Sequence, residues 1–219
     1  PVIQQIETPW DYTINANNAF KPVSRYWDRI ERPDQLMISG LNAMRVLTDP
    51  VETGAVTLCL PQDTQAEAFD YPESFLAKKV WHLDRRTPHP RALKEAVSIL
   101  ANAQKPLIVA GGGVHYSQAA ETLRAFSETF GIPVSETQAG KSAMSWKDPM
   151  SVGAVGVTGT SAANLLAKAA DVVLVVGSRL QDFTTASKQV FASEVKLLHQ
   201  NESNYDGLKM NSIMLQAYA

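Results

Sequence analysis

The chain has 219 residues, with 20 Lys and Arg against 22 Asp and Glu and 45% hydrophobic residues, a composition typical of a globular protein. This composition excludes disordered and collagen-like classes, and no window approaches the roughly 18 consecutive apolar residues of a membrane-spanning helix. A net charge of −2 with scattered basic residues provides no footprint for nucleic acid. A single cysteine, Cys59, is typical of a reducing compartment, so we expect a cytoplasmic protein that binds neither nucleic acid nor membrane.

The first 86 residues supply few elements. After an extended start and a polar loop at 15–18, apolar residues spaced three and four apart predict a helix over 34–48, with Asp34 as its N-cap. The run 55–60 predicts a strand of a parallel sheet, buried on both faces, in which Cys59 is a packed thiol. Such a sheet needs more strands than this region holds, so we expect missing strands upstream and a chain cut at both ends.

The polar, proline-rich segment 85–90 predicts a linker between two domains, 1–86 and 87–219. Beyond it, helices are expected at 91–103, 117–130 and 161–169, and strands at 107–110, 132–135, 171–176 and, last, 195–199, with a long loop over 136–160. In the first helix the expected inward residues are Leu93, Ala96, Val97 and Leu100. This alternation of helices with unbroken apolar strands predicts an α/β fold, a doubly wound parallel sheet.

Four ordered motifs carry a family resemblance: KPLIVAGGGV at 105–114, FGIPV at 130–134, GAVGVTG at 153–159 and DVVLVVGSR at 171–179. Together they resemble the central, Rossmann-like domain of thiamin-diphosphate-dependent enzymes of the acetolactate synthase superfamily. The segment 53–63 is similar to the last strand of that family's pyrimidine-binding domain. The resemblance therefore implies that 1–86 is the C-terminal part of a pyrimidine-binding domain and 87–219 a central domain truncated near its C-terminus.

Five further segments are similar to members of the superfamily that hydrolyse a carbon–carbon bond: 20–26, 43–50, 52–58, 137–142 and 198–203. They imply a homo-oligomeric hydrolase of myo-inositol catabolism that uses thiamin diphosphate and Mg²⁺ to open a small cyclic dione. Two alternatives stay open. One is an acetolactate synthase or 2-keto acid decarboxylase; the other, from a different class, is an FAD- or ADP-binding module or a structural spacer.

Two parts of the family's chemistry are missing from this sequence. The family uses a glutamate to activate the cofactor and a Gly-Asp-Gly motif to hold Mg²⁺; the chain has no Gly-Asp-Gly, and Glu52 and Glu67 do not match the glutamate. The histidines show no metal-ligand spacing, and the serines Ser142 and Ser178 lack a nucleophile elbow. We therefore expect no catalytic residue, no metal ligand and no activity in this chain alone.

The glycine-rich turn 111–113 follows a predicted strand, where backbone N–H groups favour an anion. It departs from the dinucleotide fingerprint, because the position of the third glycine is Tyr116. In flavin-using relatives this turn and three other loops surround FAD, while other relatives place ADP there or nothing. The resemblance thus implies a nucleotide site formed by Gly111, Gly112, Gly113, Thr137, Gln138, Gly156, Gly159, Gly177 and Arg179.

Two residues near this predicted site have alternative interpretations. Glu136, just past a strand, is placed where the acidic residue of such folds reaches a ribose hydroxyl. Arg179 either contacts a ligand or forms an ion pair with Asp182. The glycines themselves either contact a nucleotide or serve only the close passage of backbone segments.

Overall fold

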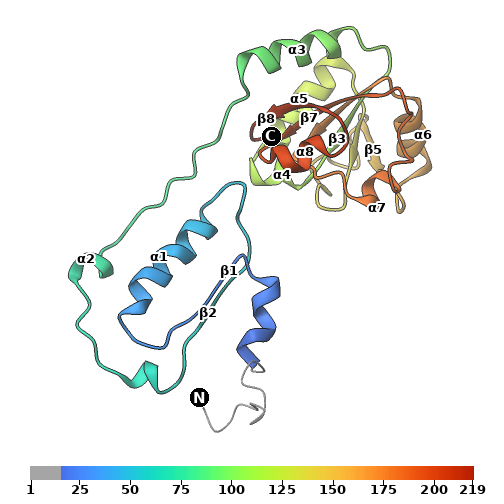
Figure 1. The fold of residues 1–219 in the computed structure, drawn as a ribbon. Coiled ribbons are helices and arrows are strands. Elements are labelled where there is room, and N and C mark those ends of the chain that lie inside the picture. The colour runs from blue at the N-terminus through green and yellow to red at the C-terminus, as the bar shows by residue number, and fades with distance from the viewer. Residues whose placement is uncertain (1–15) are drawn as a thin grey trace. The chain divides into compact units, whose positions relative to one another are not determined.

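The computed structural model of the chain describes residues 16–219, so the expected extended start lies outside the described residues. The chain divides into two compact units, one within Pro1–Asp84 and one spanning Arg85–Ala219 (Figure 1). None of the helices in residues 16–219 combines the length and apolarity that crossing a bilayer requires.

The first unit is built on two parallel strands and one long helix. Its elements, in chain order, are η1 (Ala16–Val23), β1 (Tyr26–Arg29), α1 (Gln35–Leu47), β2 (Val56–Cys59), η2 (Thr64–Ala66) and α2 (Glu73–Leu76). The predicted helix and strand are confirmed as α1 and β2. The expected loop at 15–18 is wrong from Ala16 onward, where η1 begins. Strand β1 was not predicted, because its sequence, YWDR, contains no apolar run.

Asp28 joins β1 to α1. Its carboxylate accepts hydrogen bonds from Ser39 Oγ (2.5 Å) and Gln35 Nε2 (3.2 Å) of the helix, and from Tyr26 Oη (3.2 Å) and the Arg29 backbone N–H (2.9 Å). Burial opposes ionisation of this carboxyl, but the four hydrogen bonds outweigh burial and lower its pKa. A charged carboxylate therefore fixes the helix on the strand.

Two local expectations for this unit need correction. Asp34 occupies the N-cap position of α1 as predicted, but its side chain makes no capping hydrogen bond, because its backbone is already helical and its carboxylate instead pairs with Arg32 (Nε to Oδ1, 3.1 Å). Strand β2 is half-buried rather than buried on both faces, since β1 is its single neighbour among residues 16–84. Cys59 is buried as expected, and burial raises the pKa of its thiol.

The second unit is a six-stranded parallel sheet with the order β5-β4-β3-β6-β7-β8. Its strands are β3 (Pro106–Ala110), β4 (Val134–Glu136), β5 (Ser151–Ala154), β6 (Val172–Val176), β7 (Lys196–Asn201) and β8 (Ile213–Gln216). Its helices are α3 (Pro90–Ala101), α4 (Gly112–Tyr116), α5 (Ala120–Phe130), α6 (Ser161–Ala169), α7 (Asp182–Thr185) and α8 (Asn204–Leu208). The predicted fold class, an α/β doubly wound parallel sheet, is confirmed.

Three expected boundaries in this unit are wrong. The loop predicted over 136–160 contains the edge strand β5, which includes Gly153 with a positive φ of 84° and has no apolar run. The strand at 195–199 is not the last, because β8 follows it. The helix predicted from 117 begins at Ala120, after the separate helix α4; Gln118 has a positive φ of 56° and breaks the helix there.

The inward face of α3 also differs from the prediction. The helix turns Ala92 and Ala96 toward the sheet, while Leu93 and Val97 are 45% and 57% exposed. Ala96 packs in a cluster with Val172, Leu198 and Leu215, which belong to β6, β7 and β8. Leu100 packs against the same cluster, so only Leu93 and Val97 depart from the expected inward set. The small alanine side chains let the helix axis approach the strands closely.

Both faces of the central strands are buried. Along β3, Leu107 and Val109 join one apolar cluster, with α6, while Ile108 and Ala110 join another, with α5. This two-sided burial explains why the strand reads as a continuous apolar run. Because all six strands are parallel, their carboxyl ends lie at one edge of the sheet, and the loops of that edge form the site described next.

Candidate functional site

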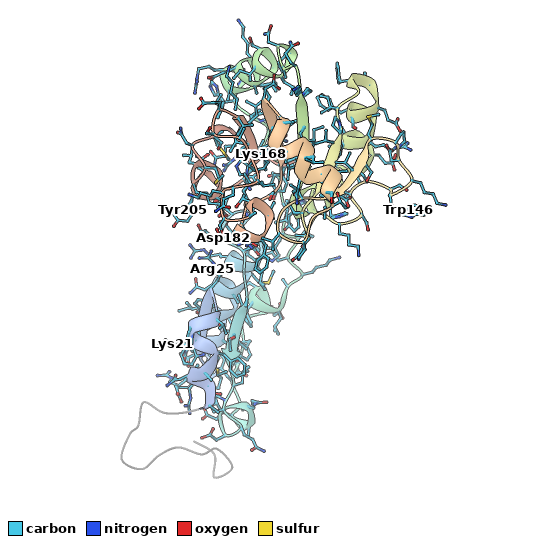
Figure 2. All side chains as sticks on the ribbon, turned by 90° about the vertical axis from the view of Figure 1, so that its right-hand side faces the viewer. Lys21, Arg25, Trp146, Lys168, Asp182 and Tyr205 are labelled. Carbon is cyan, nitrogen blue, oxygen red and sulfur yellow. The ribbon has the colours of Figure 1, made fainter. Side chains whose placement is uncertain are left out.

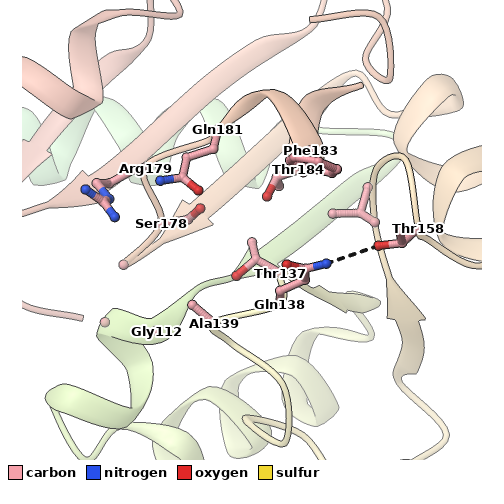
Figure 3. A pocket seen from close by; sticks show the side chains of 13 residues that line it. Gly112, Thr137, Gln138, Ala139, Thr158, Ser178, Arg179, Gln181, Phe183 and Thr184 are labelled. Carbon is pink, nitrogen blue, oxygen red and sulfur yellow. Dashed lines mark hydrogen bonds between the residues drawn. The ribbon is translucent and has the colours of Figure 1, made fainter. Parts of the chain in front are cut away.

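A cavity of about 610 Å³ lies at the carboxyl ends of β3, β4 and β6 (Figure 3). The chain leaves β3 toward β4 on one side and later returns to β6 on the other, so the order of strands reverses between β3 and β6. Loops diverge at such a point and leave a crevice where open α/β sheets bind ligands. The volume falls within the range of small-molecule sites.

Six of the nine predicted site residues come together in the lining of this pocket: Gly112, Gly113, Thr137, Gln138, Gly177 and Arg179. The other three, Gly111, Gly156 and Gly159, occupy adjoining turns and do not line it. The remaining lining residues are Ala139, Val155, Thr158, Ser178, Gln181, Phe183 and Thr184. Of these, Val155, Gln181, Phe183 and Thr184 were not expected. Val155 lies within the motif 153–159 but was not singled out there, whereas Gln181, Phe183 and Thr184 belong to no motif and lie at α7, which the fold places beside the pocket.

The glycines of the 111–113 turn allow its backbone to pack closely against the end of β6. The Gly111 N–H donates to the Val176 carbonyl oxygen (2.8 Å), and the Gly113 N–H donates to the Gly177 carbonyl oxygen (2.9 Å). A Cβ on Gly111 would lie 2.3 Å from the Gly177 carbonyl oxygen, so only glycine permits this approach. These two amides are therefore engaged by the end of β6, and contact between this turn and a nucleotide stays a prediction.

Among the described residues that line the pocket, Arg179 alone is charged. The expected ion pair with Asp182 is wrong: within the described part of the chain no carboxylate lies within 4.0 Å of the Arg179 guanidinium. Asp182 instead opens helix α7. The pocket therefore has a positive, acid-free lining, which attracts an anion.

Glu136 does not reach the pocket, so its expected role at a ribose hydroxyl is wrong. The side chain is buried, and its Oε1 accepts a hydrogen bond from the Met144 backbone N–H at 2.8 Å. This bond closes the loop after β4 onto the strand. The loop then presents Thr137 and Gln138 to the cavity.

The two walls of the pocket differ in chemistry. Figure 3 shows Ser178, Arg179 and Gln181 along the β6 side, while Gln138 Nε2 donates to Thr158 Oγ1 (3.4 Å) between the loops that follow β4 and β5. Phe183 adds a large, exposed aromatic ring to the lining. The arrangement suits a ligand with both an anionic group and an apolar or planar part.

Two titratable groups lie near the carboxyl end of β7. His199 is fully buried, and burial lowers the pKa of its imidazole despite the backbone carbonyl groups that face it. Glu202 is 11% exposed at its side chain, and within residues 16–219 neither carboxylate oxygen makes a hydrogen bond of good geometry; the Arg86 guanidinium lies 3.7 Å away. Burial raises the pKa of Glu202, and Arg86 only partly opposes that rise.

The low pKa of His199 predicts a loss of stability in mild acid. Below the ordinary histidine value of 6.5 the unfolded chain binds a proton that the native state resists, so the free energy of unfolding falls as pH decreases. Denaturant unfolding of the second unit between pH 8 and 5 measures this slope. The slope should flatten in His199→Gln; an unchanged slope in that variant would contradict the prediction.

The raised pKa of Glu202 predicts a pH dependence of stability opposite in sign to that of His199, and at lower pH. Its native pKa is raised above 4.5, so stability falls as pH rises through 4.5, where the unfolded chain loses its proton first. Glu202→Gln removes a largely buried charge that the ion pair with Arg86 only partly compensates, and we expect it to stabilise the second unit at pH 7 by about 1 kcal/mol. Thermal unfolding of both proteins is the measurement, with the exposed Glu121→Gln as control. Destabilisation by Glu202→Gln would show that the ion pair with Arg86 dominates.

No group of three or more His, Cys, Asp or Glu side chains in residues 16–219 could hold a metal ion. The pocket itself contains no carboxylate. The residues present therefore do not fit the Mg²⁺-bound diphosphate of thiamin diphosphate, which needs oxygen ligands.

A doubly wound parallel sheet with a ligand-sized crevice at its switch point defines a Rossmann-like α/β domain. The family model described as "Thiamine pyrophosphate enzyme, central domain" matches residues 93–213, more than half of the chain, and the chain belongs to this family.

Curated relatives named 3D-(3,5/4)-trihydroxycyclohexane-1,2-dione hydrolase extend the similarity to the whole chain. The Clostridium tetani (strain Massachusetts / E88) relative is 51% identical over 214 residues, covering 97% of this chain and 33% of its own length. The Bacillus thuringiensis (strain Al Hakam) and Geobacillus thermodenitrificans (strain NG80-2) relatives are each 51% identical, over 220 and 219 residues, covering 100% of this chain and 34% of their own length. The chain thus spans about a third of these relatives.

Proposed function

We propose that this chain forms part of a thiamin-diphosphate-dependent hydrolase that opens 3D-(3,5/4)-trihydroxycyclohexane-1,2-dione in myo-inositol degradation. The observation that carries the proposal is the 51% identity to relatives of that name, which extends over the whole chain and not only over the central-domain match. Thiamin diphosphate supplies a nucleophilic carbon for attack on a ring carbonyl when it is bound. Because residues 16–219 do not fit its Mg²⁺ site, we assign the ligands of that ion to other parts of the enzyme.

The first unit supports the same proposal. Its two-stranded parallel sheet leaves strand edges open within residues 16–84, and α1 exposes Ile38, Leu41 and Leu47. Two parallel strands are too few for an independently stable sheet. We therefore assign this unit to the C-terminal part of a larger pyrimidine-binding domain, and the second unit to the central domain.

A chimaera tests the activity. Residues 1–219 would replace the matching third of the Bacillus thuringiensis relative, and ring opening of the dione would be followed with thiamin diphosphate and Mg²⁺ added. We expect the chimaera to hydrolyse the dione, whereas the 219-residue chain alone shows neither turnover nor calorimetric binding of thiamin diphosphate. Activity on a 2-keto acid in place of the dione would favour acetolactate synthase or decarboxylase chemistry, and tight binding of thiamin diphosphate by the chain alone would contradict the proposal.

A second proposal concerns the pocket, which we assign to an adenine nucleotide such as FAD or ADP. The supporting observation is Arg179, which lines a pocket without acidic residues among 16–219 and whose guanidinium has no carboxylate within 4.0 Å in that range. Calorimetry with ADP and FAD tests it. We expect Arg179→Ala to weaken binding about tenfold, because a charge-assisted contact contributes about 1.4 kcal/mol or more. Arg124→Ala, on the surface of α5, is the control.

We also propose that the parent enzyme is a homo-oligomer. Trp146 (82% exposed) and Tyr205 (90% exposed) are the most exposed of the large aromatic side chains in the second unit, and they extend from its surface (Figure 2). Such side chains are enriched at protein interfaces. Analytical ultracentrifugation of the full-length enzyme should give a dimer or larger species, and a monodisperse monomer would contradict the proposal.

A further inference from the structure

The segment that carries Arg179 has an unusual backbone. Leu180 adopts a left-handed conformation (φ 45°), which a leucine rarely occupies, and its side chain is 3% exposed in the apolar cluster shared with Phe191 and Val155. The flanking residues Arg179 and Gln181 both line the pocket. A strained turn of this kind persists only where the surrounding structure holds it.

Two side chains of β7 hold this turn by contacting the same backbone atom, the Ser178 carbonyl oxygen. His199 Nε2 lies 2.6 Å from the Ser178 carbonyl oxygen, and Asn201 Nδ2 donates to the same oxygen at 2.8 Å. His199 and Asn201 are two residues apart and so project from the same face of the strand. A carbonyl oxygen only accepts hydrogen bonds, so the proton of the neutral imidazole resides on Nε2. The Ser178 hydroxyl in turn accepts the Leu180 N–H at 3.1 Å.

This arrangement exceeds what filling a core requires. An apolar side chain would fill the volume of His199 without burying polar atoms, yet His199 is fully buried. Its Nδ1 makes no hydrogen bond of good geometry in the described residues, although the Gly207 backbone also faces the ring. One donor would also suffice for a carbonyl group, whereas here both acceptor positions of Ser178 are used. Burying the imidazole costs free energy, and what it provides in return is a second hydrogen bond that holds the Ser178 peptide group beside the pocket.

We propose that His199, assisted by Asn201, is a positioning residue of the pocket: its Nε2–H holds the Ser178 carbonyl and thereby keeps the strained turn at Leu180 and the guanidinium of Arg179 on the cavity. The proposal rests on the assignment of the pocket to an anionic nucleotide. Strand β7 does not line the pocket, but two of its side chains set the position of Arg179, which does.

Two variants separate the hydrogen bond from the volume of the side chain. His199→Gln keeps an amide N–H near the position of Nε2, whereas His199→Met fills a similar volume without a donor. We expect His199→Met to weaken ADP binding at least tenfold and to speed hydrogen exchange of the Leu180 amide at least tenfold, and His199→Gln to restore both to within about threefold of the wild type. Equal losses in the two variants, or wild-type behaviour in both, would overturn the proposal.

The exchange measurement is made without ligand, so it stays decisive if the pocket assignment fails. If the wild-type chain bound neither ADP nor FAD, the assignment of the pocket to a nucleotide would be wrong. The positioning role of His199 would still be supported if slow hydrogen exchange at Leu180 depended on a donor at residue 199. Asn201→Ala removes the second donor from a less buried site and should give an intermediate exchange rate, with the exposed Asn204→Ala as control. If the His199 variants do not fold, nitrogen-15 shifts of the wild-type imidazole decide: the proton must be on Nε2, and a proton on Nδ1 overturns the proposal.

Discussion

Gly177→Ala is expected to destabilise the second unit by about 3 kcal/mol or more, because two separate penalties act at this position. Gly177 has a positive φ of 61°, and a Cβ there would lie 2.5 Å from Gly113 Cα, an atom of the backbone that cannot move aside. The loss would extend to the pocket, since the same contact joins α4 to the end of β6. Denaturant unfolding of the full chain, followed by hydrogen exchange of amides in β6, measures the effect.

Gly131 provides a matched control. It ends α5 with a φ of 64°, nearly the value at Gly177, but a Cβ on Gly131 would meet no atom within 4 Å. Gly131→Ala therefore carries only the conformational penalty, about 1 kcal/mol. Similar losses in the two variants would show that backbone conformation, and not the approach of the two segments, requires the glycine at 177.

Leu198→Ala is expected to lower the free energy of unfolding of the second unit by about 3 kcal/mol, through lost burial and the cavity that remains. Leu198 lies in β7, has no exposed surface, and packs in the cluster that joins α3 to the sheet. The substitution removes contacts with Ala96 and Leu215 at once. Chemical denaturation with a fluorescence or circular dichroism signal is the measurement.

Leu208→Ala is the control for this prediction. Leu208 ends α8 and is largely exposed, so its truncation should change stability by no more than about 0.5 kcal/mol. If Leu198→Ala had as small an effect as Leu208→Ala, the cluster beneath α3 would not be a tightly packed core.

The central strands and the long helices could be predicted because their signals are local. The runs that form β3 and β6 are uninterrupted apolar segments bounded by glycine, proline or charge. Helix α6 begins at Ser161 and is capped by Thr160, whose side chain accepts the Ala163 N–H. Each signal lies within about ten residues of the element it specifies. Central parallel strands are buried on both faces, which makes them the most readable part of such a sheet.

The edge strands could not be predicted in the same way. Strands β1, β5 and β8 have four residues each, and β5 pairs with β4 through a register shift between Val134 and Ser135. Short edge strands need no continuous apolar pattern, because they are half-buried and a neighbour supplies their hydrogen bonds. Their existence depends on partners distant in the sequence.

Most of the residues that line the candidate site were also predicted, but the hydrogen bonds that they make were not. The motifs indicated Gly112, Thr137 and Arg179, since loops at the carboxyl ends of parallel strands meet at one edge. They did not indicate Phe183 or Gln181, which reach the pocket only because α7 folds back beside it.

By itself, the sequence determined the alternation of strands and helices, the family to which the chain belongs and the loops that meet at the pocket. The tertiary structure decided which hydrogen bonds those loops make: Gly111 and Gly113 donate to the end of β6, Glu136 accepts from Met144, and the Ser178 carbonyl accepts from His199. Periodicity and motifs record which side chains are apolar and where the backbone must turn, and these are local properties. The partner of a buried polar group is set by which strands become neighbours, and that is known only once the sheet has formed.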